Sequence, residues 1–321
     1  MFPAFHRCKS EIASSLALAC LLIPGMSSAK SYAEKPVRFI VPYGPGGGAD
    51  LMARIVQPKL ADLLGQQVVI DNRPGASGNI GADIAAKAPA NGYTLFMATA
   101  NFSMAKSVFG KLMFDPVQDF AAISLLGKAP SILAVNPSLQ VMSVKDLIAL
   151  AKANPGKLNY ASDGGGPLQL FVELLKTTAK VDLTNVPYNS TGPAILAVMS
   201  GEASVVMAPA IAVIPHAKSG RLRALAVSSA QRLGVLPDLP TVAESGVPGF
   251  EANQWYGILV PAGTPGAIVK ELNEYCVKIM QMADIRSRLA SEATLVVGST
   301  PQEFSKFLKE DIGKWAMATK H

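Results

Sequence analysis

Cysteine and histidine are scarce in this chain of 321 residues, which contains three of each. Two of the cysteines lie in an N-terminal segment with the pattern of a secretory signal. Cys276 is therefore the only cysteine expected in the mature chain, which excludes an internal disulfide. The later histidines, His216 and His321, have no carboxylates near them at metal-ligand spacing. We expect neither a metal site nor a cofactor.

Long hydrophobic runs are also absent. The run that comes closest, residues 12–23, meets a Pro-Gly pair after about twelve residues, whereas a membrane-spanning helix needs about 20. Basic residues precede this run and small residues follow it, as in a secretory signal peptide. We predict that residues 1–29 form the signal peptide, with cleavage after Ala29 or Ala33, and that the mature protein is periplasmic.

Cys20 allows a lipoprotein signal as an alternative for this segment. The residue three positions earlier is Ala17 rather than Leu, and the apolar run continues past the cysteine to Ile23. Anchoring through a lipid on Cys20 is therefore the less favoured interpretation.

Lysine and arginine form no run interleaved with aromatic residues, although the formal net charge is +6. A face that binds nucleic acid needs such a pattern, so we expect no nucleic-acid partner. The small positive excess favours solubility and gives a slight preference for anions.

Short apolar strands alternate with amphipathic helices from residue 37 onwards. Strands are expected at 37–41, 67–70 and 94–98, with helices at 49–64 and about 80–87 between them. This βαβ order predicts an α/β fold with a largely parallel sheet.

Three helices carry further local signals. Pro58 lies inside the first helix and predicts a kink there. Ser143 and Thr300 are expected to be the N-caps of two later helices. One long helix is expected from 267 to 289, with Cys276 on its apolar stripe as a core thiol.

Two strand-rich segments, 123–137 and 255–265, are each expected to pass between two domains. Two crossings make the first domain discontinuous, with residues 34–134 and 255–321, while residues 135–254 form the second. The prediction is a two-lobed fold with a ligand cleft between the domains.

Glycine-rich loops in both domains are the main candidate binding elements. The first loop, residues 43–50, joins a strand to a helix, where free amides and the helix dipole favour an anion. A tight strand-to-helix turn is the alternative, but three consecutive glycines exceed what turning requires. The second loop, residues 161–167, follows the same logic, so the two loops could hold opposite ends of one ligand. Residues 187–193 form a third candidate, which an ordinary capped turn explains equally well.

Two enzyme classes fit parts of the sequence less well. Gly44, Gly46 and Ala49 match a dinucleotide-binding pattern, with Asp71 ending the next strand. A secretory signal and the lack of a later hydride-transfer constellation count against it. A serine hydrolase would need a G-x-S-x-G elbow, which is absent, and His216 as its only internal base. We expect no enzyme.

Eight segments of the sequence occur as a recognisable set: VRFIVPYGPGGGAD, VVIDNRPGASGNIGA, APANGYTL, FDPVQDFAAISLL, VPYNSTGPA, SGRLRALAVSS, LPDLPTVAESGVPGFE and WYGILVPAGTP. Together and in this order they closely resemble the Bug family, the periplasmic solute receptors of tripartite tricarboxylate transporters. The resemblance implies a two-lobed fold of the type II periplasmic-binding class. It also implies that the lobes close over a carboxylate, held mainly by backbone amides, hydroxyls and water.

The resemblance also implies a site made by both lobes. Matching positions are Tyr43, Pro45, Gly46, Gly47, Gly48, Asp50, Thr99, Asn101, Ser162, Asp163, Gly164, Gly165, Gly166, Tyr188, Asn189, Ser190 and Thr191. Asp50 is expected to orient the first loop rather than to touch the ligand.

The second loop departs from similar sequences. Gly164, Gly166 and Gln169 stand where Asn, Ser and His are common, and Ser204 stands where Asp is common, so side-chain groups are missing. Asp163 places a negative charge beside an expected anion site. Our hypothesis is a ligand with one carboxylate at the first loop and a neutral or cationic group at the second.

We expect a monomeric transport receptor that binds a small-molecule carboxylate and docks on the permease subunits of a tripartite transporter. A receptor that presents its ligand to a sensor-kinase ectodomain is the alternative from a different functional class.

Overall fold

The computed structural model describes Met1 and residues 32–164 and 166–318. Apart from Met1, the predicted signal peptide with Cys20 lies outside these residues, as does Gly165, so the predictions made for them stay untested. Among the described residues, no helix combines the length and the apolar character that a membrane crossing requires.

Ten strands pair into one mixed sheet in the described part of the chain. They are β1 (Val37–Val41), β2 (Val68–Asn72), β3 (Thr94–Thr99), β4 (Phe120–Val135), β5 (Asn159–Ser162), β6 (Thr184–Pro187), β7 (Val205–Pro209), β8 (Arg223–Val227), β9 (Asn253–Pro261) and β10 (Leu295–Val296). Their order is β2-β1-β3-β9-β4-β7-β5-β6, with β8 and β10 also paired to β4.

Helices connect most of these strands, which confirms the α/β class. They are α1 (Gly48–Leu64), α2 (Asn79–Ala86), α3 (Ala100–Phe109), α4 (Val144–Ala153), α5 (Pro167–Ala179), α6 (Thr191–Ser200), α7 (Ala210–Lys218), α8 (Gly266–Gln281), α9 (Ala283–Ser291) and α10 (Pro301–Ala318), with a short 3-10 turn η1 (Ala76–Gly78).

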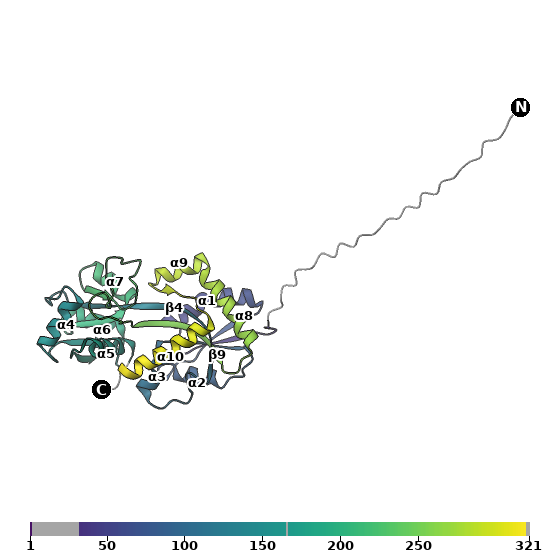
Figure 1. The fold of residues 1–321 in the computed structure, drawn as a ribbon, viewed down its shortest axis with the longest axis horizontal. Helices are drawn as coiled ribbons and strands as arrows, with labels where there is room; N and C mark the ends of the chain where they lie inside the picture. The colour runs from purple at the N-terminus through teal and green to yellow at the C-terminus, as the bar shows by residue number, and fades with distance from the viewer. Residues whose placement is uncertain (2–31, 165, 319–321) are drawn as a thin grey trace. The chain divides into compact units, whose positions relative to one another are not determined.

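Strand β4 belongs to both halves of the sheet. Its residues 120–130 pair with β9, and its residues 131–135 pair with β7 and β8. Figure 1 shows β4 and β9 side by side. We call β1, β2, β3, β9, β10 and the start of β4 the first half-sheet, and β5 to β8 with the end of β4 the second half-sheet. Both segments expected to cross between domains are strands, although the domain boundaries stay a prediction.

Strand directions aim the loops of the two half-sheets at each other. Strands β1 and β3 run parallel to β4, because β9 lies antiparallel between β3 and β4. Strands β5, β6 and β7 run antiparallel to β4. The carboxyl ends of β1 and β3 therefore point toward the second half-sheet, and those of β5 and β6 toward the first.

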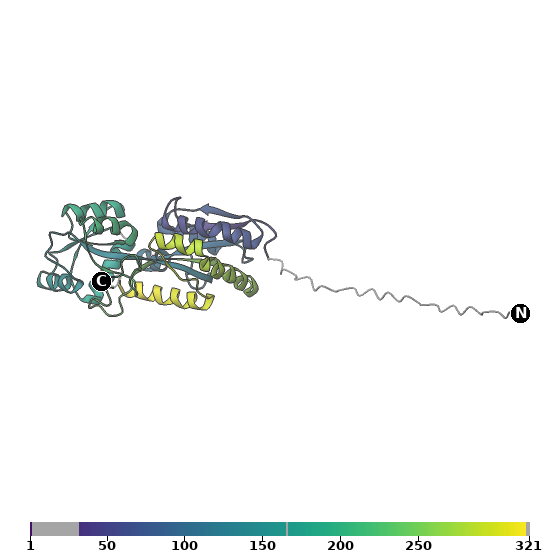
Figure 2. The ribbon, with the colours of Figure 1, turned by 90° about the horizontal axis from the view of Figure 1, so that it is seen from above.

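Helices cover both faces of the first half-sheet. One hydrophobic cluster packs α1, α8 and α9 on one face, and another packs α2, α3 and α10 on the opposite face; α1 and α10 lie on opposite sides of the strands in Figure 2. The second cluster continues into the other half-sheet, where Trp315 of α10 stacks on Phe171 of α5 with ring centroids 5.6 Å apart. Helix α10 therefore ties the two half-sheets together along one face.

A buried carboxylate fixes α10 to the strands beneath it. Asp311 is 4% exposed and accepts hydrogen bonds from the indole nitrogen of Trp255 at 2.9 Å and from the Ser103 hydroxyl at 2.5 Å. Lys314 Nζ lies 2.5 Å from its other oxygen. These three partners offset the cost of burying the charge.

The expected single helix from 267 to 289 is wrong, because the chain divides it at Met282 into α8 and α9. The apolar stripe of α8 through Cys276 and Ile279 would continue in an unbroken helix at Ala283 and Ser287. The large apolar side chains come instead at 285 and 289, and both are buried. Extended backbone at Met282 (φ −63°, ψ 134°) shifts the phase of the helix so that they reach the same core.

Several local expectations are confirmed. The Ser143 hydroxyl accepts a hydrogen bond from the amide of Asp146, and Thr300 and Glu303 bond reciprocally as a capping box. Cys276 is a buried core thiol. Helix α1 continues without interruption past its internal proline, and the kink there stays a prediction.

A close approach of α10 to the sheet generates a stability prediction. A Cβ on Gly257 of β9 would overlap the ring of Phe304, so Gly257→Ala should lower the free energy of unfolding by about 1–3 kcal/mol. Gly313→Ala is the matched control, because a Cβ there meets nothing within 4 Å and alanine favours a helix by about 0.5–1 kcal/mol. Urea unfolding measures both, and a Gly257→Ala protein as stable as the wild type would refute the close approach.

Candidate ligand-binding site

Asp50 fixes the conformation of the first loop through the hydrogen bonds of its side chain. Its side chain is 2% exposed and accepts hydrogen bonds from the Gly46 amide at 2.9 Å, Arg54 Nε at 2.7 Å and Asn72 Nδ2 at 3.0 Å. Asn72 also donates to the Tyr43 carbonyl at 2.9 Å. The loop is thus tied at both ends, and Asp50 orients it.

The charge of Asp50 is balanced inside this network. The hydrogen bond from Arg54 lowers the pKa of Asp50 to about 2, against the opposing effect of burial. The carboxylate is therefore ionised at neutral pH and directed at its own loop and at Arg54.

The start of α1 faces solvent with its amides uncapped. Gly47 is the N-cap residue and no side chain caps the helix, while residues 45–48 are exposed. The first amides of a helix have no partners within the helix, and the dipole is positive there. This geometry suits a carboxylate without any lysine or arginine.

Tyr43 and Thr99, both expected in the site, are in direct contact. The Tyr43 hydroxyl lies 3.1 Å from Thr99 Oγ1 and donates to the Ser77 carbonyl at 3.2 Å. These residues and Gly78 line a small space of about 10 Å³, close to the room that one water needs. Ser77 and Gly78 were missed as site residues, although they follow β2 within the glycine-rich NRPGASG stretch.

The second loop and the third segment lie together in the other half-sheet. The Ser162 hydroxyl accepts a hydrogen bond from the Gly164 amide at 3.3 Å. The backbone carbonyl of Ser162 accepts another from the Tyr188 amide at 2.9 Å. The Tyr188 hydroxyl donates to Glu202 at 2.8 Å. Ser190 is the N-cap residue of α6, but its hydroxyl makes no capping bond, so a capped turn does not account for this segment. Asn189 is exposed and Thr191 is half-buried.

The expectation of free amides at the second loop is wrong. Asp163 folds back and accepts hydrogen bonds from the amides of Leu168 at 3.4 Å and Gln169 at 3.3 Å, in the first turn of α5. Pro167, the first residue of that helix, has no amide hydrogen. The Asp163 carboxylate thus forms hydrogen bonds with the first turn of α5.

A cavity of about 240 Å³ adjoins the first loop and includes residues of the second half-sheet. Gly48 and Tyr256 line it together with Pro209 at the end of β7. A Cβ on Gly48 would overlap the Tyr256 hydroxyl, so any larger residue here would have to displace that ring. Gln254 also lines the cavity, and its buried Oε1 has no hydrogen-bond partner in the described residues. The sequence did not predict these contacts, because the residues that make them lie in β7 and β9, far from Gly48 along the chain.

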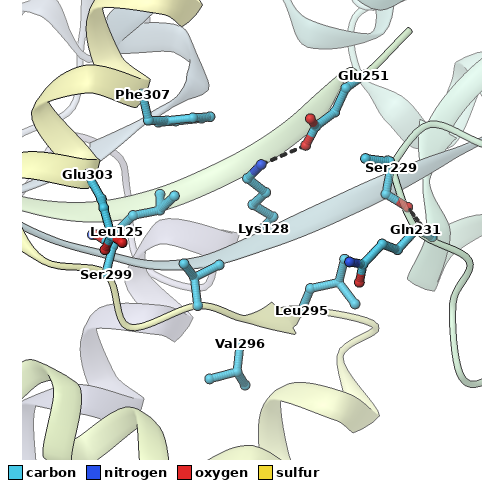
Figure 3. Close-up of a pocket in the computed structure, with 12 residues that line it drawn as sticks. Leu125, Lys128, Ser229, Gln231, Glu251, Leu295, Val296, Ser299, Glu303 and Phe307 are labelled. Carbon is cyan, nitrogen blue, oxygen red and sulfur yellow. Dashed lines mark hydrogen bonds and ion pairs between the residues drawn. The ribbon is translucent and has the colours of Figure 1, made fainter. Parts of the chain in front are cut away.

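A larger cavity, of about 550 Å³, holds none of the expected site residues. It lies between β4, β10, α10 and the segment after β8, with Leu295, Phe307 and Gln231 in its wall (Figure 3). Lys128 Nζ lies 2.6 Å from Glu251 Oε1, so this cation is already paired. The cavity is therefore a weaker candidate for an anion than the first loop.

For the remaining expected site residues, the described structure gives a position but no side-chain hydrogen bond within the site. Asn101 lies in the first turn of α3, two residues after Thr99, and Pro45 is exposed in the first loop. Among the described side chains, no group of three or more histidine, cysteine, aspartate or glutamate residues could hold a metal ion.

Comparison with known proteins bears directly on this arrangement. The family model described as the tripartite tricarboxylate transporter family receptor matches residues 52–321. The chain belongs to this receptor family. Protein BugT of Bordetella pertussis is 35% identical over 292 residues, which are 90% of each chain. The resemblance to the Bug family is confirmed.

Solved structures of this receptor family share the two-lobed fold. The R. palustris protein Rpa4515, solved with adipate, has 34% identity and a TM-score of 0.76 over 90% of this chain and 98% of its own. MatC from Rhodopseudomonas palustris, solved with bound malate, has 30% identity and a TM-score of 0.73 over 89% and 99%. The predicted fold class is thereby confirmed.

The Asp50 network generates a pH-dependent prediction. The pKa of Asp50 is depressed from 3.8 to about 2, so the stability it contributes is present above pH 3.8 and is lost as the pH falls toward 2. Asp50→Asn should lower the free energy of unfolding by about 1–2 kcal/mol at pH 7 and by less at pH 3.

Denaturant unfolding of both proteins at the two pH values tests this. Asp62→Asn removes an exposed acid from the same helix and should change little at either pH. An equal loss for Asp50→Asn at both pH values would show that the charge is not what stabilises the loop.

Proposed function

We propose that the protein is a periplasmic solute-binding receptor. It captures a small carboxylate-bearing metabolite between its two lobes and delivers it to the membrane subunits of a tripartite tricarboxylate-type transporter. The observation that carries this proposal is the uncapped, exposed start of α1, held in a fixed loop by Asp50. Membership of the receptor family and relatives solved with adipate and malate support a carboxylate ligand.

The strength of such a site comes from amide hydrogen bonds and the helix dipole. A hydrogen bond to a charged group contributes about 1.5–3 kcal/mol, and the dipole adds about 0.3–1 kcal/mol. Association costs about 4–15 kcal/mol, so contacts from the second half-sheet are also needed to reach micromolar binding, which corresponds to about −8 kcal/mol. This strength suits a receptor, because a ligand that must be released to a permease cannot be held irreversibly.

Capture also requires the second half-sheet to contribute. The directions of β1, β3, β5 and β6 aim loops from both halves toward one another, and residues from both halves line the cavity beside Gly48. We place the first domain at residues 34–134 and 255–321 and the second at 135–254, with the monomer as the working unit.

A single amide hydrogen tests the site. Gly47 has φ −75°, and a Cβ there would make only an ordinary contact of 3.8 Å with the Gly44 carbonyl, so proline is compatible with its φ and removes the N–H. Gly47→Pro should weaken carboxylate binding about 10-fold or more, whereas Gly47→Ala, which keeps the N–H, should bind nearly as the wild type does.

The mature protein is first screened by thermal shift against acidic, neutral and amino-acid metabolites, since a ligand at 100 times its Kd adds about 2.7 kcal/mol to stability. Calorimetry on the hits then compares the two variants. Equal binding by Gly47→Pro and Gly47→Ala would remove the start of α1 from the site.

A further inference from the structure

The Asp163 carboxylate and the backbone of the helix together occupy the amides at the start of α5. The Leu168 amide donates to one carboxylate oxygen at 3.4 Å, and the Gln169 amide is shared between the other oxygen at 3.3 Å and the Gly166 carbonyl at 3.1 Å. Pro167 has no amide hydrogen to offer. The next amide along, that of Leu170, donates to the Gly166 carbonyl inside the helix. A ligand arriving at this helix meets a carboxylate rather than free amides.

Gly166 is shaped around that carboxylate. Its backbone, with φ −93° and ψ −169°, lies in the extended region that any residue adopts. A Cβ at this position would nevertheless overlap the Asp163 carboxylate. The glycine is therefore required by the position of the aspartate side chain and not by the turn of the chain, so the two residues form an interlocked pair.

The charge of Asp163 has no cationic partner of the kind that balances Asp50. Arg54 lies against Asp50 at 2.7 Å, whereas no ion pair to Asp163 is found among the described residues. Burial raises the pKa of Asp163, and the amide bonds from Gln169 and Leu168 oppose that shift. The two glycine loops therefore differ in charge character, with free amides in the first and a half-buried carboxylate in the second.

We propose that Asp163 is a specificity-determining residue, which occupies the place of a ligand's second carboxylate and restricts the site to ligands whose second end is cationic or a neutral hydrogen-bond donor. The inference rests on the proposed function, because it assumes that the first loop binds the ligand's one carboxylate. A like charge brought against Asp163 is repelled, while an ammonium or amide group is attracted.

Matched pairs of probes measure this selectivity directly. Adipate and 6-aminohexanoate, glutarate and 5-aminopentanoate, and succinate and 4-aminobutanoate each differ only in one terminal group. We expect the wild-type protein to bind the amine of a pair at least about tenfold more tightly than the dicarboxylate in isothermal calorimetry.

Three variants separate charge from occupancy. Asp163→Ala removes both and should shift the ratio toward the dicarboxylate by about tenfold or more. Asp163→Asn keeps an acceptor for the α5 amides but removes the charge, so it should lose amine preference without gaining as much dicarboxylate affinity. Gly166→Ala keeps the charge but displaces the carboxylate from the amides, which should shift the ratio in the same direction by less.

Asp182→Asn is the control for net charge. Asp182 follows the end of α5. Its carboxylate lies 4.0 Å from Nζ of Lys176, in the last turn of that helix and so at the opposite end from Asp163. The substitution Asp182→Asn removes one negative charge near α5 and should leave the ratio of amine to dicarboxylate affinity unchanged. Thermal unfolding of each variant confirms that it is folded, since the loss of a helix cap lowers stability.

Several outcomes would overturn the assignment. They are a dicarboxylate preference in the wild type, an unchanged ratio in both Asp163→Ala and Gly166→Ala, and no binding of any of the six probes to either wild type or Asp163→Ala. The proposed function fails separately. If another carboxylate binds the wild type and Gly47→Ala but not Gly47→Pro, the receptor function stands and only the role of Asp163 falls.

Discussion

The backbone hydrogen bonding of β4 is the constraint on which the rest of the molecule depends. One continuous strand pairs with β9 over its first part and with β7 and β8 over its end. Its direction fixes the direction of every strand around it and so decides which loops face one another. Because α10 also packs against both half-sheets, through the Trp315–Phe171 stack, any movement of one half-sheet against the other has to bend β4 while α10 restrains one face.

Two aspartates of the glycine loops show how environment assigns a role. Asp50 is buried beneath its loop and its charge is balanced by Arg54, so it acts as a support that leaves the amides of α1 free. Asp163 lies at the start of α5, and its carboxylate accepts hydrogen bonds from amides in the first turn of that helix. The same residue type thus leaves the first amides of α1 free and forms hydrogen bonds with those of α5.

Local sequence signals predicted much of the fold and part of the site. Apolar strands such as β1 and β3 and the caps at Ser143 and Thr300 depend on neighbouring residues, so their patterns can be read along the chain. The division at Met282 could not be read, because no glycine or proline marks it and only packing against the core sets the phase of α9. The double role of Asn72 and the contact of Tyr256 with Gly48 join segments far apart in sequence. Asp163 was recognised as a charge, but its contact with the α5 amides depends on three-dimensional loop geometry.

The interlocked pair at 163 and 166 also limits how this receptor could have diverged. A side chain cannot be added at Gly166 while the Asp163 carboxylate stays where it is, whereas Asp163 can be replaced with the glycine left unchanged. Position 163 can therefore change on its own, whereas position 166 can change only after the aspartate is lost or moved. A lineage moving toward a serine at 166 would pass most smoothly through loss of the aspartate first, and a comparison of many related chains should find the two residues changing in that order.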